Sequence, residues 1–223
     1  PPPARASGAR LASRADPAPD HRSFRERVLS SLPEGKLAYV PGGVAQTRNG
    51  VEGNARFRQE PNFLYLTGIT EPGYHALFGT GADAPYVLVA PRQPPEMDVW
   101  CGAQMSRDEL RACHGADIVY YDDEWDKALA AVDALEGQTV FVPTHQKEGE
   151  AARAAPLPHD RDGLFEGLCP EHTALTNALA KHRAIKTEAE MACLRFANAV
   201  SGDAHVAAWR HCAANGGDVF EFE

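Results

Sequence analysis

The densest group of side chains that could do chemistry is His159-Asp160-Arg161-Asp162. An imidazole and two carboxylates are groups that bind divalent cations in proteins. This group lies in a stretch rich in proline, glycine and charge, with no helical or strand periodicity to fix the geometry of ligands. We therefore interpret it as a solvated loop rather than a metal site.

Nucleophilic chemistry has one candidate, the neighbouring pair Cys113-His114. A cysteine nucleophile needs a histidine in hydrogen-bonding geometry, and adjacency along the chain does not supply it. His205 and His211 are six residues apart on a predicted helix, so they lie on different faces. The sequence has no GxSxG, P-loop, GxGxxG or HExxH motif. From its own residues, the chain is predicted to hold no catalytic residue and no metal ion.

The amino-acid composition of the chain limits which partners and which cellular compartment are expected. The net charge of −9 and the lack of a basic stripe argue against a nucleic-acid partner. The apolar runs are too short to span a bilayer, so no membrane partner is expected. Five widely spaced cysteines favour reduced thiols and a cytoplasmic protein. Residues 1–16 are rich in arginine, serine and alanine, which leaves a mitochondrial transit peptide as the alternative to a disordered tail.

The elements that would position functional side chains alternate between strands and helices. Strands are predicted at residues 36–40, 63–69, 74–79, 86–90, 116–121 and 138–142. Helices are predicted at residues 24–32, 106–113, 123–135 and 172–184, with Ser23 and Ser106 as N-caps that begin capping boxes. This order predicts an α/β fold with a mixed sheet flanked by helices.

The C-terminal part of the sequence predicts a long helix. Thr187 and Glu190 form a capping box, and apolar residues then recur at helical spacing for about 25 residues. Asp218 and Glu221 have the spacing of a further helix start close to the last residue, so we expect the chain to be part of a longer protein.

Three collinear motifs resemble those of Xaa-Pro aminopeptidases (aminopeptidase P) and prolidases. The first is FRQEPNFLYLTGITEPG at residues 57–73, in which Arg58 and Gln59 are expected to tie a loop to the sheet. The second is an aliphatic strand that ends in Pro91-Arg92 and is followed by Trp100-Cys101-Gly102. The third is the junction pattern of Arg183, Lys186 and Glu190.

The resemblance implies a domain division and a parent activity. Residues 1–21 would be a tail, residues 22–184 a creatinase/prolidase N-terminal-like domain, and residues 185–223 the start of a truncated pita-bread catalytic domain. The full-length parent would be a metallopeptidase that uses two manganese ions to hydrolyse the bond between an N-terminal residue and proline. Its metal ligands would lie beyond residue 223, so the 223-residue chain is expected to be inactive.

The resemblance also implies a role for Trp100 as a substrate-binding residue. In the family this domain serves assembly, as a dimer or tetramer, and walls off part of a neighbouring subunit's active site. An indole can stack on a prolyl ring of an Xaa-Pro peptide. The alternative is that Trp100 fills a local core. Gln104 and Met105 lie where many relatives have arginine, so contacts to the charged end of a substrate are expected to differ.

Two functions remain open. The first is the Xaa-Pro peptidase, for which the sequence does not separate aminopeptidase from dipeptidase. The second is a non-catalytic module of the same fold that binds peptides or proteins.

Overall fold

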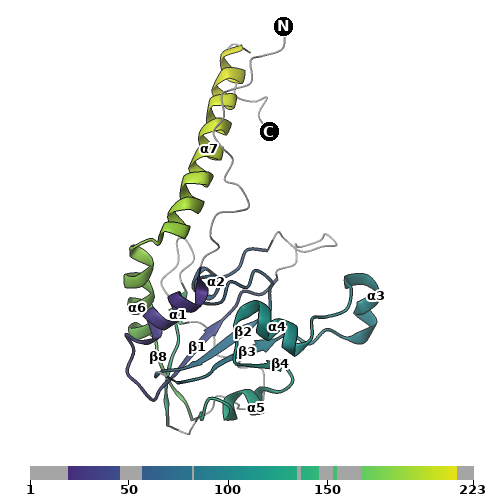
Figure 1. The fold of residues 1–223 in the computed structure, drawn as a ribbon, viewed down its shortest axis with the longest axis vertical. Coiled ribbons are helices and arrows are strands. Elements are labelled where there is room, and N and C mark those ends of the chain that lie inside the picture. The colour runs from purple at the N-terminus through teal and green to yellow at the C-terminus, as the bar shows by residue number, and fades with distance from the viewer. Residues whose placement is uncertain are drawn as a thin grey trace. The chain divides into compact units, whose positions relative to one another are not determined.

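The computed structural model describes residues 20–45, 57–81, 83–134, 137–145, 153–154 and 167–214. The chain divides into two compact units (Figure 1), one of which is Asp20–Ala184. The described residues of the other are 185–214. The assignment of these units to the predicted domains stays a prediction. The predicted helix start at Asp218 lies outside the described residues.

A mixed sheet forms the centre of the Asp20–Ala184 unit, in agreement with the fold class that the sequence predicts. Its six strands are β1 Leu37–Pro41, β2 His75–Gly79, β3 Tyr86–Ala90, β4 Ile118–Tyr121, β5 Thr139–Phe141 and β8 Cys169–Glu171. The spatial order is β4-β3-β2-β1-β5-β8. The pairs β1–β2 and β2–β3 are antiparallel, whereas β3–β4, β1–β5 and β5–β8 are parallel. A separate two-stranded sheet pairs β6 Thr144–His145 with β7 Arg153–Ala154.

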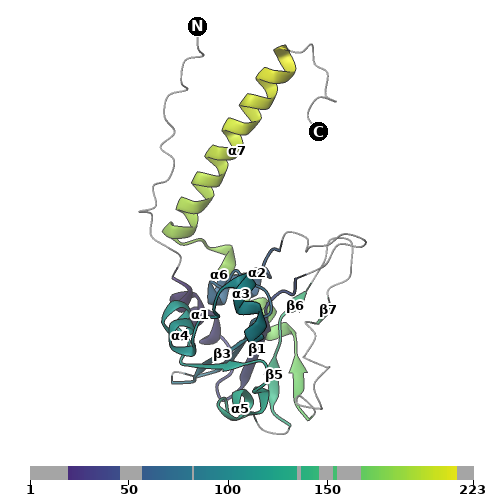
Figure 2. The ribbon, with the colours of Figure 1, turned by 90° about the vertical axis from the view of Figure 1, so that its right-hand side faces the viewer.

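Helices cover both faces of this sheet (Figures 1 and 2). The helices that pack on it are α1 His21–Leu29, α2 Pro61–Thr67, α4 Arg107–His114, α5 Trp125–Ala130 and α6 Thr173–Ala184. Alternate residues of a strand point to opposite faces. Ala38 and Val40 of β1 therefore join the core formed with α1, α2, α4 and α6. Leu37 and Tyr39 join the second core, formed with α5. Burial on both sides explains why the central strands are continuous apolar runs.

The strand predicted at residues 63–69 is wrong, because this segment forms helix α2. The Glu60 carboxylate accepts a hydrogen bond from the Phe63 backbone N–H at 2.6 Å, and Pro61 occupies the first turn. Gly68 ends the helix in the left-handed conformation, at φ +72°. Aromatic residues favoured a strand, but a carboxylate before proline and a glycine seven residues later are helix start and stop signals.

The polar residues on both sides of α2 have structural roles. Gln59 accepts a hydrogen bond from the Gly43 N–H at 2.6 Å and donates one to the Glu71 carbonyl at 2.7 Å. This confirms that Gln59 ties the preceding loop to the turn before β2, whereas Arg58 is exposed. Gly73 in that turn has a φ of +84°, a conformation that glycine adopts readily.

Other element boundaries differ from the predicted ones. Helix α1 begins three residues earlier than predicted, and its N-cap is Asp20, which accepts from the Ser23 N–H at 3.2 Å, rather than Ser23. Helix α5 is shorter than residues 123–135. Strand β8 was not predicted, because Cys169-Pro170-Glu171 lies at the sheet edge with little burial and therefore lacks an apolar pattern.

The second unit contains one long helix, α7 Glu188–Ala214. The Glu190 carboxylate accepts from the Thr187 N–H at 2.8 Å, and the Thr187 hydroxyl accepts from the Glu190 N–H at 3.3 Å. The capping box predicted from the sequence is confirmed. None of the described residues of α7 is buried, and the side chains of Phe196 and Trp209 are exposed.

A buried arginine joins three elements of the larger unit. The Arg25 guanidinium on α1 donates to the Leu66 carbonyl of α2 at 2.8 Å and to the Gly115 carbonyl, at the end of α4, at 3.3 Å. The central carbon of the Arg25 guanidinium, Cζ, lies 4.6 Å from the centre of the Tyr86 ring. Burial lowers the pKa of Arg25, because it disfavours the charged form of the guanidinium. The two carbonyls favour the charged form, since carbonyls at the C-terminal end of a helix interact favourably with a cation.

We expect Arg25→Met to lower the free energy of unfolding by on the order of 3 kcal/mol, because two buried carbonyls lose a charged donor. Urea unfolding followed by circular dichroism measures this change. Arg22→Met is the matched control on the same helix. It removes an exposed ion pair with Glu26 and should change stability by about 0.5 kcal/mol or less. Equal losses in the two variants would contradict this role for Arg25.

Candidate functional site

Trp100 lies on an arm that leaves the sheet at the carboxyl ends of β3 and β4. We define the arm as residues 93–104, which contain the 3-10 helix η1 Pro95–Met97 and the short helix α3 Asp98–Cys101. Figure 1 shows α3 standing away from the sheet. The parallel strands β3 and β4 end side by side at Ala90 and Tyr121. This is the edge at which the sheet of an α/β protein commonly presents functional side chains.

The side chain of Trp100 is 83% exposed, and the neighbouring Val99 is 85% exposed. The alternative that Trp100 fills a local core is therefore wrong. Trp100 lies on the short helix α3. Its role in substrate binding stays a prediction.

Side-chain amides hold the arm together. The Gln104 oxygen accepts from the Gln93 backbone N–H at 3.0 Å, and the Gln104 amide nitrogen donates to the Pro91 carbonyl. The Gln93 amide nitrogen donates to the Asp98 carboxylate at 2.6 Å and to the Gly102 carbonyl at 2.8 Å. The Gln104 amide is therefore engaged with the backbone of its own arm.

Charged residues surround the base of the arm. The Glu124 carboxylate accepts from Arg107 at 2.6 Å and from Lys127 at 3.1 Å, and it also lies 3.7 Å from the Arg92 guanidinium. Arg92 forms a second ion pair, at 2.7 Å, with Asp123. The guanidiniums of Arg92 and Arg107 lie 4.3 and 5.0 Å from the centre of the Tyr121 ring. These side chains come from β4, α4, α5 and the residues next to them, including Arg92 just before the arm, so the network fixes the base of the arm to the sheet.

Glu124 is the most perturbed acid of this network. Burial by itself would raise the pKa of Glu124, but hydrogen bonds from the Tyr121 N–H, Lys127 and Arg107 outweigh it and lower the pKa to about 2. A carboxylate held by this many donors stays ionised and structural. It is therefore a poor proton acceptor for catalysis at neutral pH.

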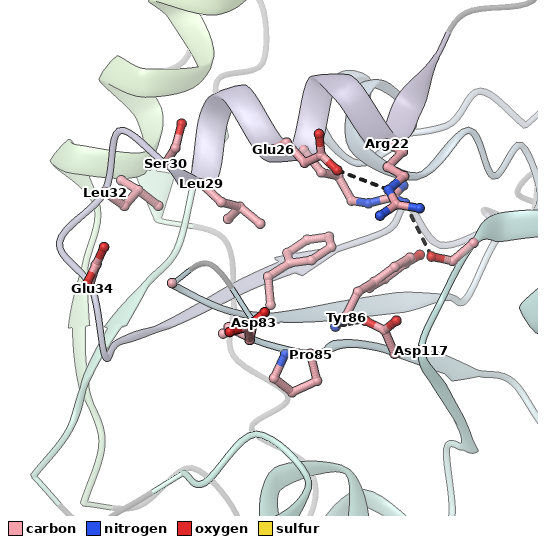
Figure 3. A pocket seen from close by; sticks show the side chains of 16 residues that line it. Arg22, Glu26, Leu29, Ser30, Leu32, Glu34, Asp83, Pro85, Tyr86 and Asp117 are labelled. Atoms are coloured by element: carbon pink, nitrogen blue, oxygen red, sulfur yellow. Dashed lines mark hydrogen bonds and ion pairs between the residues drawn. The ribbon is translucent and has the colours of Figure 1, made fainter.

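A pocket of about 730 Å³ lies at the opposite end of β3. Figure 3 shows Glu26 and Leu29 of α1 on one side of it, and Pro85, Tyr86 and Asp117 on the other. The Asp117 carboxylate accepts from the Tyr86 N–H at 2.8 Å. The Tyr86 hydroxyl is buried, makes no hydrogen bond in the described part of the chain, and has a pKa raised by burial. Arg25, which also lines the pocket, is already engaged with two carbonyls.

The other residues singled out from the sequence do not form a site. His159-Asp160-Arg161-Asp162 lies outside the described residues. Cys113 is exposed, while His114 packs edge-on against Tyr74 and has its pKa lowered by burial. Within the part of the chain that the structure describes, no three His, Cys, Asp or Glu side chains could hold a metal ion. Over the same residues, no helix has the length and apolarity to cross a membrane.

Comparison with known proteins decides the family. The family model for the N-terminal domain of aminopeptidase P matches residues 21–141, more than half of the chain. The chain belongs to the aminopeptidase P N-terminal domain family. The match contains the sheet from β1 to β5, α2 and the whole Trp100 arm, so the resemblance found in the sequence is confirmed.

Relatives of the chain are named as Xaa-Pro peptidases. The Xaa-Pro dipeptidase of Homo sapiens is 25% identical over 184 residues, which are 81% of this chain and 35% of that protein. A probable Xaa-Pro aminopeptidase of Chaetomium globosum is 33% identical over 155 residues, which are 70% of this chain and 24% of that protein. The chain thus spans about a third or less of the length of these relatives.

A solved structure supports the fold assignment. The structure of a protein described as an aminopeptidase P from Bacillus anthracis has a TM-score of 0.63 and 20% sequence identity. The alignment covers 77% of this chain and 41% of the Bacillus anthracis chain. At this identity the likeness concerns the fold, which is the mixed sheet with flanking helices.

We expect the stabilisation that Glu124 provides to depend on pH. The pKa of Glu124 is about 2 in the folded state, whereas its ordinary value, which applies to the unfolded chain, is 4.5. The contribution of the Glu124 carboxylate to the free energy of unfolding is therefore complete above about pH 4.5. It is lost as the pH falls toward 2, because the unfolded chain then binds the proton first. The difference in melting temperature between the wild type and Glu124→Gln should therefore be largest above pH 5 and shrink toward pH 2.

Glu96→Gln is the control for this pH series. It makes the same chemical change at an exposed position of η1 and should give a small difference in melting temperature at every pH. A Glu124→Gln difference that stays constant from pH 7 to pH 2 would contradict the assignment.

Proposed function

We propose that this chain is the N-terminal part of a metal-dependent Xaa-Pro peptidase, which hydrolyses the bond between an N-terminal residue and proline. The observation that carries the proposal is the family match over residues 21–141, together with relatives named as Xaa-Pro dipeptidase and Xaa-Pro aminopeptidase. In this proposal the domain serves assembly into a dimer or tetramer and forms one wall of an active site.

Trp100 is proposed to contact the substrate. It is an exposed aromatic residue on an arm whose base is held by the hydrogen bonds of Gln104 and, at the neighbouring Arg92, by an ion pair to Asp123. A flat indole offers a stacking surface for a prolyl ring and one N–H donor. Large apolar side chains exposed in this way commonly mark a surface that something covers.

The metal ions of the proposed enzyme need other residues. The residues that the structure describes do not fit a two-metal centre, since no group of three suitable side chains is found among them. The described residues therefore carry no proposed catalytic step. Two manganese ions are proposed to be held by other residues of the full-length protein.

The alternative is a non-catalytic module of the same fold that binds peptides or proteins. Such a module would have the same exposed Trp100 arm. Peptide binding therefore does not distinguish it from a peptidase, whereas peptide hydrolysis does. We expect the full-length protein to hydrolyse Xaa-Pro peptides in the presence of manganese and to lose this activity after chelation. Assays on Xaa-Pro dipeptides and on longer Xaa-Pro peptides distinguish a dipeptidase from an aminopeptidase. Peptide binding without hydrolysis under any metal would favour the alternative.

In the full-length protein, we expect Trp100→Ala to lower kcat/KM for Xaa-Pro peptides about fivefold or more while the melting temperature stays nearly unchanged. Loss of a stacking contact is worth on the order of 1 kcal/mol, and an exposed side chain contributes little to folding. Steady-state kinetics and thermal melts measure the two quantities together.

Trp125 provides the matched control for truncating an indole. It is 4% exposed, so Trp125→Ala should cost about 3–5 kcal/mol of stability. Val99→Ala controls for loss of apolar surface beside Trp100. A Trp100→Ala variant that melts like Trp125→Ala, with activity per folded molecule unchanged, would exclude the substrate-binding role.

A further inference from the structure

The orientation of Trp100 needs an explanation that packing does not provide. None of the residues of η1 and α3 is buried, so no core fixes the arm. A helix of four residues is also too short to be stable by itself in water. An indole that must meet a ligand in one geometry has to be held by something else.

Gln104 joins the two ends of the arm. Its oxygen accepts from the Gln93 N–H, and its nitrogen donates to the carbonyl of Pro91, so one side chain binds two backbone groups at the start of the arm. Beyond the end of β3, these two side-chain hydrogen bonds satisfy backbone groups that a neighbouring strand would otherwise pair with. The Gln104 side chain is half-buried, which protects these bonds from competition by water.

Gln93 forms two exposed hydrogen bonds to the two ends of α3. Its amide nitrogen donates to the Asp98 carboxylate at the start of α3 and to the Gly102 carbonyl just after α3. Trp100 lies between these two partners. The Gly102 N–H donates to the Asp98 carbonyl at 3.0 Å, so the turn of helix that carries Trp100 is bound at both of its ends.

The stem next to Gln93 is fixed to the sheet. The Arg92 N–H donates to the Asp122 carboxylate at 3.1 Å, and the Arg92 guanidinium pairs with Asp123 and lies over the Tyr121 ring. The hydrogen bonds of Gln93 and Gln104 therefore connect α3 to a rigid base rather than to a mobile loop.

We propose that Gln93 and Gln104 are positioning residues, which set the orientation of Trp100 and through it the affinity for substrate. This inference rests on the proposed function of the Trp100 arm. The expectation that contacts to the charged end of a substrate differ from those of relatives stays a prediction, and the Gln104 amide is engaged with the backbone of its own arm. Supporting side chains of this kind, which hydrogen-bond to the segment that carries a binding residue, keep that residue within a few tenths of an ångström of its productive position.

The test uses the full-length protein with Gln104→Met, Gln104→Glu and Gln93→Met. Methionine keeps the length of glutamine and removes both hydrogen bonds, whereas glutamate keeps an acceptor for the Gln93 N–H and loses the donor to Pro91. Hydrogen exchange over residues 93–104 reports on arm order without reference to activity. We expect exchange to be at least tenfold faster in both methionine variants and intermediate in Gln104→Glu.

Kinetics then connect arm order with substrate binding. KM for Xaa-Pro peptides should rise about fivefold in Gln104→Met, with kcat changed less than twofold and the melting temperature nearly unchanged. In a Trp100→Ala background the same substitution should have no further effect on KM, because the glutamine acts through Trp100. Glu96→Gln, on the same arm but outside this set of hydrogen bonds, should match the wild type in both measurements.

The outcomes separate this inference from the proposed function. Unchanged hydrogen exchange in Gln104→Met would overturn the inference, as would a rise in KM of the same size with and without Trp100. If Trp100→Ala raises KM but neither glutamine variant does, the proposed function stands and the inference fails. If Trp100→Ala leaves kcat/KM unchanged, the proposed role of Trp100 fails, and with it the inference that the glutamines set the affinity for substrate, while turnover of Xaa-Pro peptides still decides the proposed peptidase function.

Discussion

The buried guanidinium of Arg25 is the interaction on which the arrangement of this domain depends. It meets the C-terminal carbonyls of α2 and α4, which have no partner within their own helices. Helix ends that stop over an apolar sheet leave such groups out of reach of water, and leaving them unpaired is unfavourable. One cation on α1 satisfies both, so it fixes the relative positions of three helices on the same face of the sheet.

This constraint extends to the edge of the sheet that carries the Trp100 arm. Helix α4 follows the Trp100 arm directly, and its N-terminus is closed by the capping box of Ser106 and Glu109. The C-terminal end of α4 is held by Arg25, while Arg107 in its first turn pairs with Glu124. The arm is therefore bounded by a strand, β3, and by a helix that is fixed at both ends. The exposed side chains of the arm are thus mounted on a base that is fixed to the sheet.

Local signals in the sequence predicted the parts of the fold that depend on local contacts. The capping boxes of Ser106 with Glu109 and of Thr187 with Glu190 were readable because each uses residues three apart. Strand β3 was readable because burial on both faces requires an unbroken apolar run. Helix α2 was missed because its aromatic residues resemble a strand, and β8 because an exposed edge strand has no apolar pattern.

The site was predictable only in part. The family resemblance supplied the proposed role of Trp100, whereas the sequence left open whether it fills a local core. The partners of Gln93 and Gln104 were not readable, because a glutamine amide that binds backbone groups up to thirteen residues away leaves no trace in periodicity. Arg25 was missed for the same reason, since its two carbonyl partners come from distant helices.

The way in which the arm is built has a consequence for how such proteins diverge. The side chains of Met97, Val99 and Trp100 make no contribution to a core, because none of them is buried. Their replacement is therefore free of the packing penalties that constrain Phe63 or Leu88 in the interior. Single substitutions at the tip of the arm can therefore accumulate, while Gln93, Gln104 and the ion pairs at the base of the arm preserve its conformation. New recognition properties can arise here without a loss of stability that other mutations must first offset.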